Sequence, residues 1–408
     1  MLHPLLVLGI LAPSQLASSQ EAAGLYSGLG MAKECFKVIR TYPEMNISAL
    51  RAFDDLEEHR QEIWRITAGL RGFPPHEYSG YHGPWIENWW IKTFQDRPTK
   101  DFGGLIPIFA QWVDNGFRTR DWHSNGYVLV ELAKAMRPDV GYITVSQHDK
   151  GIIHNLAGMS DKIGLEVLQK TKRALSNLLI MSAGGIGHIP LPLLKQPMEL
   201  HTPSDNPQQL ITTFGKIDKS RPMRRLVSTH ISHQLMPAPH LPSTNPAAHA
   251  LRLSQLKTEM DNLPPADRSK CLWYYGGKWL GHMHDSKFTM YPRGCGRSAF
   301  GLYETIQMGF LPIYVYDDYE WLPYRGSPNA DRDIFGLSMK LGSLQQCVHA
   351  AAAVNKSDVV ERRATLKRLI NSHFTYAGVI AQIEKFLANG SHPVYGSDLR
   401  CGPEGLRI

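Results

Sequence analysis

The sequence of 408 residues predicts an α/β protein built from two Rossmann-like domains that face one cleft. Two observations lead to this prediction. Apolar runs typical of strands alternate with amphipathic segments typical of helices, which is the pattern of folds built on parallel sheets. A polar stretch near residues 200–210 then interrupts the alternation. We therefore expect a first domain over residues 20–205, a second over 206–345, and C-terminal helices over 346–408.

The first half is expected to contain four helices and two strands. Short apolar runs predict a strand over Asp139–Ser146 and a broken strand over Ile186–Leu194. An aromatic, proline-rich loop, Gly72–Asn88, connects the first two helical segments. Amphipathic periodicity predicts the helices over Gly24–Arg71, Trp85–Phe94, Asn125–Arg137 and Leu165–Leu179.

The second half is expected to begin with a strand over Leu210–Phe214. The segment Met236–Asp267 contains six prolines, which is typical of a long surface excursion. The last part of the chain has the periodicity of three helices, over Leu344–Ala353, Ser357–Asn371 and Tyr376–Leu387.

The most informative stretch, Ser286–Gly326, has the pattern of a strand, a turn, a helix and a second strand. Phe288–Tyr291 and Phe310–Tyr316 have the apolar runs of strands that are buried on both faces. Ser298 is a good N-cap for a helix over Ala299–Met308, and the glycine that follows is a good stop signal. Two parallel strands joined by one helix form a right-handed crossover unit.

The turn of this unit has the chemistry of a nucleotide-sugar site. Ligands of parallel sheets bind beyond the carboxyl ends of the strands, where a helix N-terminus directs free N–H groups at an anion. The residues expected to hold a diphosphate are the two arginines, two glycines and serine of the turn: Arg293, Gly294, Gly296, Arg297 and Ser298. Glu304, on the helix, is expected to accept hydrogen bonds from ribose hydroxyls.

The same stretch resembles the exostosin-like glycosyltransferases. The match consists of the apolar strand, Pro-Arg-Gly, a Gly/Arg/Ser stretch, a helix with Glu, and a Pro-containing strand followed by an acidic residue and Leu322-Pro323. Val145–Gly151 is similar to the family's strand ending in His-Asp-x-Gly, Thr213–Arg225 to its Phe-x-Gly strand, and Phe374-Thr375-Tyr376 to its tail.

The resemblance implies the two-domain fold called GT-B, with an acceptor domain first and a nucleotide-sugar-binding domain second. It also implies inverting transfer of a sugar, with a UDP-sugar as the donor and a glycan or glycoprotein as the acceptor. Such enzymes can assemble as homo-oligomers or as hetero-oligomers with other transferases.

The acceptor hydroxyl must lose a proton during transfer, and two residues are candidates for the base. His148 and Asp149 follow a predicted strand, where catalytic groups gather, and either side chain could accept the proton. Lys216 and Arg225 are secondary candidates for phosphate contact. The isolated histidines His123, His154, His188 and His230 are expected to be structural or exposed.

We expect no metal and no cofactor. Single-domain glycosyltransferases hold Mn²⁺ through Asp-x-Asp at the end of a strand, but the only such triplet here, Asp331-Arg332-Asp333, lies in a polar loop. Arginines and a helix terminus would take the place of the cation at the diphosphate.

The N-terminal segment and the sequons point to the secretory pathway. Residues 1–19 have a short apolar core followed by small residues, as in a cleaved signal peptide, and the core is too short to span a membrane. The sequons at Asn46, Asn355 and Asn389 fit this route. We expect the Golgi or ER lumen, with membrane association open and an extracellular location less favoured. The five cysteines have no metal-ligand spacing and allow one or two disulfides.

Two other functions are disfavoured and two remain open. The net charge of +7 suits anionic ligands, but the basic residues are scattered, so nucleic-acid binding is disfavoured. A dinucleotide-dependent oxidoreductase is disfavoured because no Gly-x-Gly-x-x-Gly follows an early strand. A non-catalytic partner of an active transferase stays open. So does a carbohydrate-binding protein that would use the aromatic loop, with Tyr78, Tyr81, Trp85, Trp89 and Trp90.

Overall fold

The computed structural model is an α/β protein with two parallel sheets, which confirms the predicted fold class. The structure describes residues 53–78, 81–102, 105–121, 123–137, 140–149, 151–156, 159–175, 177–214, 271–274, 278–294, 296–316, 320–324, 335–340 and 344–389.

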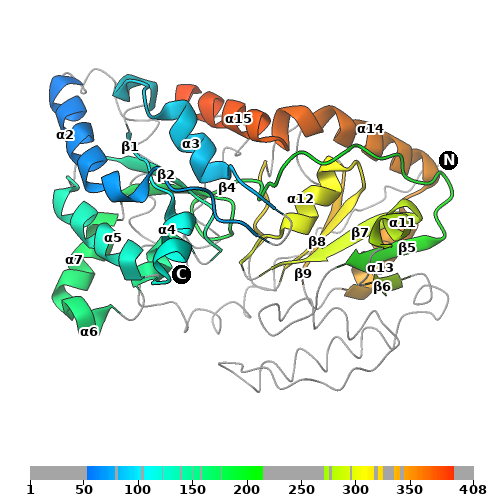
Figure 1. Ribbon diagram of the computed structural model, residues 1–408. Helices are drawn as coiled ribbons and strands as arrows, with labels where there is room; N and C mark the ends of the chain where they lie inside the picture. The colour runs from blue at the N-terminus through cyan, green and yellow to red at the C-terminus, as the bar shows by residue number, and fades with distance from the viewer. Residues whose placement is uncertain are drawn as a thin grey trace, which may run out of the picture.

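The first half is a four-stranded parallel sheet flanked by helices (Figure 1). Its strands lie in chain order: β1 (Ile106–Ile108), β2 (Tyr142–Ser146), β3 (Leu178–Ser182) and β4 (Ile189–Pro190). The helices of this half are α2 (Phe53–Ile66), α3 (Ile86–Phe94), α4 (Trp112–Thr119), α5 (His123–Ala135), α6 (Ser160–Ile163) and α7 (Leu165–Leu175).

The second half is a five-stranded parallel sheet with the strand order β6-β5-β7-β8-β9. The predicted crossover unit is present: β7 and β8 pair in parallel, and α12 connects them. The strands are β5 (Gln209–Phe214), β6 (Cys271–Tyr274), β7 (Ser286–Pro292), β8 (Pro312–Tyr316) and β9 (Leu337–Lys340), with helices α11 (Trp279–His284), α12 (Phe300–Gln307) and α13 (Leu344–Ala353).

Two C-terminal helices connect the halves. Figure 1 shows α14 (Lys356–His373) beside the second sheet and α15 (Tyr376–Asn389) continuing toward α3 of the first half. At the start of α15, the ring of Tyr376 stacks on Trp89 of α3 with the centroids 5.7 Å apart. The Tyr376 hydroxyl also donates to the Leu194 carbonyl at 2.9 Å, so this buried contact anchors the C-terminal helix to the first half.

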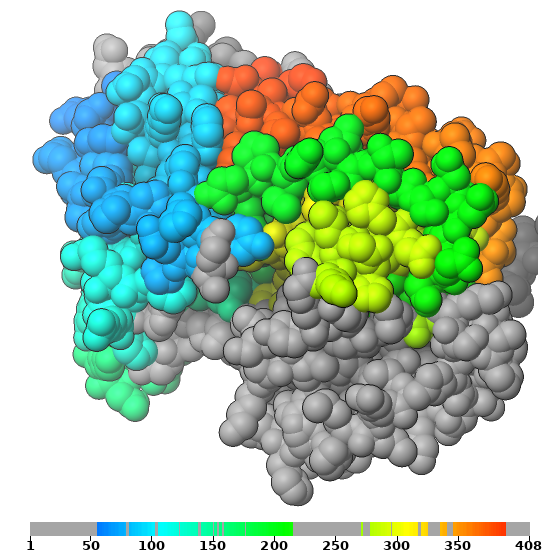
Figure 2. Space-filling view, turned by 45° about the vertical axis from the view of Figure 1, so that its right-hand side comes forward, coloured from blue at the N-terminus to red at the C-terminus, as the bar shows by residue number. Residues whose placement is uncertain are grey.

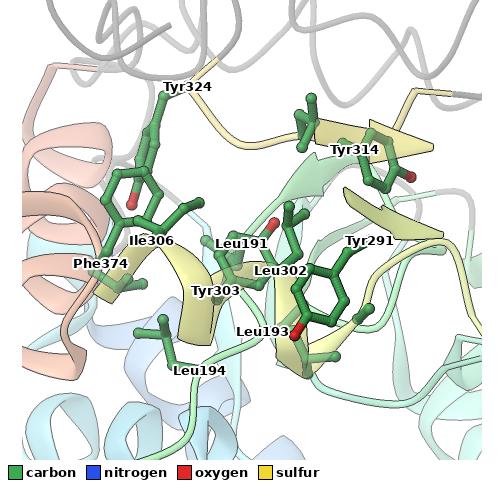
Figure 3. Packing of buried hydrophobic residues seen from close by; sticks show 14 of the residues in the cluster. Leu191, Leu193, Leu194, Tyr291, Leu302, Tyr303, Ile306, Tyr314, Tyr324 and Phe374 are labelled. Carbon is green, nitrogen blue, oxygen red and sulfur yellow. The ribbon is translucent and has the colours of Figure 1, made fainter. Parts of the chain in front are cut away.

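The central strands of both sheets are buried on both faces, as their continuous apolar runs predict. The core continues between the halves. Figure 3 shows Leu191, Leu193 and Leu194, which follow β4, beside Leu302 and Tyr303 of α12. Residues 195–208 then run along the surface between α12 and the C-terminal helices (Figure 2).

Two secondary-structure predictions for the first half were wrong in part. The predicted helix Leu165–Leu179 ends at Leu175, because Leu178 and Leu179 begin β3 and pair with β2. Only Ile189–Pro190 of the broken strand joins the sheet. The edge strand β1 was not predicted at all, since its sequence is the short run Ile-Pro-Ile and proline is tolerated only at sheet edges.

Candidate functional site

Three turns meet where strands of the two sheets end. Residues 147–149 follow β2, the glycine loop 183–188 follows β3, and the basic turn 293–298 follows β7. A Cβ on Gly296 would lie 2.1 Å from the Gly184 carbonyl oxygen and 2.5 Å from that of Asp149. A Cβ on Gly184 would lie 2.1 Å from the His148 carbonyl oxygen. The turns therefore pack backbone against backbone, and only glycine allows this approach.

The structure brings the candidate base pair together with the basic turn. His148 Nδ1 lies 3.6 Å from Asp149 Oδ1. The histidine side chain is 5% exposed, whereas that of Asp149 is 44% exposed. The His148 amide donates to Ser146 Oγ at 3.1 Å and its carbonyl accepts from Gly151 N, so the turn is held at both sides. Asp149 is thus the member of the pair that solvent and ligands can reach.

The two arginines of the basic turn donate to backbone carbonyls. Arg293 Nη1 lies 3.3 Å from the Gly296 oxygen, and Arg297 Nη1 reaches across to the Gly185 oxygen of the first half at 3.5 Å. Gly185 has a φ of +120°, and a Cβ there would lie 2.4 Å from Arg297 N. Both hydrogen bonds are long, so they are weak bonds that a phosphate oxygen could replace.

Ser298 is not the N-cap of the helix, contrary to the prediction. α12 begins at Phe300 with Ala299 in the capping position, and no side chain caps it. The reason lies in the turn, because the Gly294 amide donates to the Ser298 carbonyl at 2.9 Å and closes the turn before the helix begins. The helix ends at Gln307, one residue before the predicted end, and the predicted stop residue Gly309 follows with a φ of +86°. Ser298 itself is buried next to the helix start.

Glu304 lies at a second contact between the halves. Tyr81 Oη of the aromatic loop donates to its Oε1 at 2.6 Å, and Lys195 Nζ donates to the same oxygen at 2.8 Å. Burial and the Glu304 carboxylate raise the pKa of Tyr81. The aromatic loop packs against the same helix, since Tyr78, Tyr81 and Trp85 all contact the ring of Phe300. In Figure 2 the blue atoms of the first half meet the yellow atoms of the second there.

Glu87 is a site residue that the sequence reasoning missed. It is 2% exposed and accepts hydrogen bonds from the Gln147 amide at 2.8 Å and the Val113 amide at 3.1 Å. It therefore joins the start of α4 to the turn that carries His148 and Asp149. Burial, with the nearby Asp114 carboxylate, raises the pKa of Glu87 well above its usual value. A signal was present, because the acid occurs between Ile86 and the buried Trp90 on an apolar helix face.

Several predicted residues lie outside the described part of the chain: Lys216, Arg225, His230, the Asp331-Arg332-Asp333 triplet, residues 1–19, Met236–Asp267, and the cysteines at 35, 295 and 401. Among the residues that are described, no group of three His, Cys, Asp or Glu side chains could hold a metal ion. Cys271 and Cys347 are buried. Within the same ranges, none of the helices has the length and apolar character needed to cross a bilayer.

Comparison with known proteins gives partial structural likenesses. No protein-family model matches the sequence, and no curated protein matches it. The Anabaena protein HepE in complex with UDP has a TM-score of 0.33 at 10% identity, over 64% of this chain and 76% of its own. An α-glucosyltransferase in complex with UDP and DNA has a TM-score of 0.32 at 14% identity, over 64% and 74%. TarM has a TM-score of 0.32 at 10% identity, over 61% and 50%. At these scores the likeness carries no argument about the ligand or activity of this chain.

Proposed function

We propose that this chain is a glycosyltransferase that moves a sugar from a nucleotide-sugar, with UDP as the nucleotide, to a hydroxyl group of a glycan or glycoprotein. One observation carries the proposal. The basic turn after β7 lies directly against the turn of Asp149, with only glycine between their backbones. The turns that carry an exposed carboxylate and two arginines thereby meet at the strand ends of two parallel sheets, where such folds bind ligands.

The basic turn supplies the groups that a diphosphate requires. Arg293 and Arg297 can exchange their long carbonyl contacts for charge-assisted bonds to phosphate oxygens. The N-terminus of α12 adds backbone N–H groups next to the turn. Glu304, on the same helix, would accept hydrogen bonds from the ribose hydroxyls. Negative charge that develops on the departing UDP would be stabilised by the arginines, without a metal ion or another cofactor.

Asp149 is the base in this proposal, and buried His148 supports it. The carboxylate takes the proton of the acceptor hydroxyl while the acceptor oxygen forms a bond to the anomeric carbon of the donor sugar. The bond from that carbon to the phosphate oxygen breaks on the opposite face, so UDP leaves with the electron pair and the configuration inverts. Membership of the exostosin-like family, action in the Golgi or ER lumen and removal of residues 1–19 are parts of the same proposal.

Arg297→Ala is the decisive test. We expect UDP release from the active donor, found with a panel of UDP-sugars and glycan acceptors, to fall by at least about 100-fold, because the leaving group loses its cation. The control is Arg173→Ala, which removes the same charge from an exposed position on α7 and should leave release unchanged. Thermal unfolding of both variants should stay near that of the wild type.

The outcomes separate the rival functions. Unchanged UDP release in Arg297→Ala would contradict the site assignment. Wild-type protein that binds UDP but releases none from any donor would instead indicate a non-catalytic partner. The carbohydrate-binding alternative has less support, because Trp85 and Trp90 of the aromatic set are buried and the tyrosines pack on Phe300.

A further inference from the structure

A buried lysine joins the aromatic loop to Glu304, the carboxylate proposed to accept hydrogen bonds from the ribose. Lys195 follows β4 and its side chain is only 6% exposed, while that of Glu304 is 15% exposed. Its Nζ lies 2.8 Å from Glu304 Oε1, 2.8 Å from the centroid of the Tyr81 ring and 5.0 Å from that of Phe300. The ammonium is therefore enclosed by one carboxylate and two aromatic faces, which favour a cation.

Both hydrogen bonds to Glu304 end on the same oxygen. Tyr81 Oη and Lys195 Nζ both donate to Oε1, at 2.6 and 2.8 Å. Two donors on one oxygen fix the rotation of the carboxylate, so the direction in which Oε2 points is also fixed. Oε2 is then the oxygen through which Glu304 can accept from a ligand.

A contribution to stability does not by itself explain why Tyr81, Lys195 and Glu304 form a polar, charged cluster. Removing two charges from water costs free energy that their attraction only roughly offsets, so a packed apolar pair would serve as well for packing. An apolar pair could not orient the Glu304 carboxylate, whereas the lysine and the tyrosine hydroxyl do so through hydrogen bonds. The donors also come from the first half, whereas Glu304 belongs to α12 of the second.

We propose that Lys195 and Tyr81 are positioning residues that orient Glu304 for the ribose hydroxyls of the nucleotide, so that ribose recognition by the second half depends on the first. This inference rests on the proposed function. It assigns the lysine and the tyrosine no contact with the reacting atoms. They act through Glu304, which should make their effect specific to ligands that carry the hydroxyls.

The test compares the affinities of UDP and 2′,3′-dideoxy-UDP, measured by titration calorimetry on the full chain. The wild type should prefer UDP by at least about tenfold, as expected for hydrogen bonds to a charged acceptor. Tyr81→Phe and Lys195→Met should each lower this preference by at least about threefold. The ratio is informative because losing a positive charge near a diphosphate weakens both ligands alike, whereas losing the orientation of Glu304 weakens only UDP.

The control and the second variant keep the test decisive. Lys92→Met removes an exposed lysine that lies 5.4 Å from the Trp89 ring, and it should keep the wild-type ratio. Tyr81→Phe removes a single oxygen and retains the lysine–glutamate ion pair. Its ratio of affinities for the two ligands therefore tests the proposal even if Lys195→Met fails to fold. If Tyr81→Phe and Lys195→Met both keep the wild-type ratio of affinities, the positioning role is overturned but the proposed function is not. A wild type without affinity for UDP would overturn the proposed function and this inference with it.

Discussion

Two of the contacts between the halves of the molecule differ in their construction. At the glycine junction, Gly184, Gly185 and Gly296 let backbone pack directly on backbone. At the clasp, defined as Tyr81, Lys195 and Glu304, long side chains bridge the halves. A backbone contact has almost no freedom to adjust, whereas hydrogen-bonded side chains can exchange partners. The distance between the Asp149 backbone and the basic turn is therefore set rigidly, whereas the side chains of the clasp are able to rearrange.

The largest effect is expected at the glycine junction, from Gly296→Ala. The new Cβ would meet two carbonyl oxygens at 2.1 and 2.5 Å, and neither belongs to a flexible side chain. The turns must move apart, which should destabilise the fold by about 3 kcal/mol and, through a displacement of about 1 Å, lower turnover by about 100-fold. Urea unfolding and UDP release measure the two effects.

Gly281→Ala is the matched control for this substitution. The glycine lies inside α11 with nothing within 4 Å of the added methyl group. Alanine should therefore stabilise the helix by about 0.5–1 kcal/mol and leave turnover unchanged. A Gly296→Ala variant as stable as Gly281→Ala would show that the glycine junction is not rigid. The two contacts would then not differ in their freedom to adjust.

An intermediate effect is expected from pH, through His188 of the glycine loop. Its Nδ1 accepts from the Ile180 amide at 2.9 Å, and burial lowers its pKa to about 3. Below the unfolded pKa of 6.5, the unfolded chain takes up a proton that the folded chain does not. Stability should therefore fall as the pH drops from 6.5 toward 3.

His188→Asn isolates this contribution, because asparagine can still accept from the amide but does not titrate. Between pH 7 and pH 5 the wild type should lose about 2 kcal/mol more unfolding free energy than the variant. Urea unfolding at both pH values measures the difference. Parallel losses in the two proteins would show that the loop is not held by a neutral histidine.

The smallest effect is expected at the periphery, from Glu384→Gln on α15. Glu384 pairs with Arg97, but both side chains are more than one-third exposed, so water screens the pair. Its loss should cost less than about 1 kcal/mol and leave UDP release unchanged. Glu361→Gln, at an exposed position on α14, is the charge-matched control. A loss above about 2 kcal/mol relative to that control would make this ion pair a third junction.

The elements with strong local signals were predicted closely. The helix Leu344–Ala353 has the expected bounds, and the crossover unit needed only small changes at its ends. β3 was missed because leucines at helical spacing continue through Leu178 and Leu179, and only pairing with β2 decides that they form a strand. The apolar helix face around Glu87 was a local signal for its burial, but its partners are backbone amides 26 and 60 positions away, which no local pattern reveals.

The sequence by itself determined that this chain forms two parallel-sheet halves, and that a turn with two arginines precedes a helix with one acid. Local patterns of burial, glycine and charge suffice for that, because strands, turns and helices follow from neighbouring residues. Only the tertiary structure decided that Asp149, rather than His148, is exposed, and that Glu304 is held by Tyr81 and Lys195. The contacts of Glu304 join residues more than 100 positions apart, and burial and charge act through space rather than along the chain.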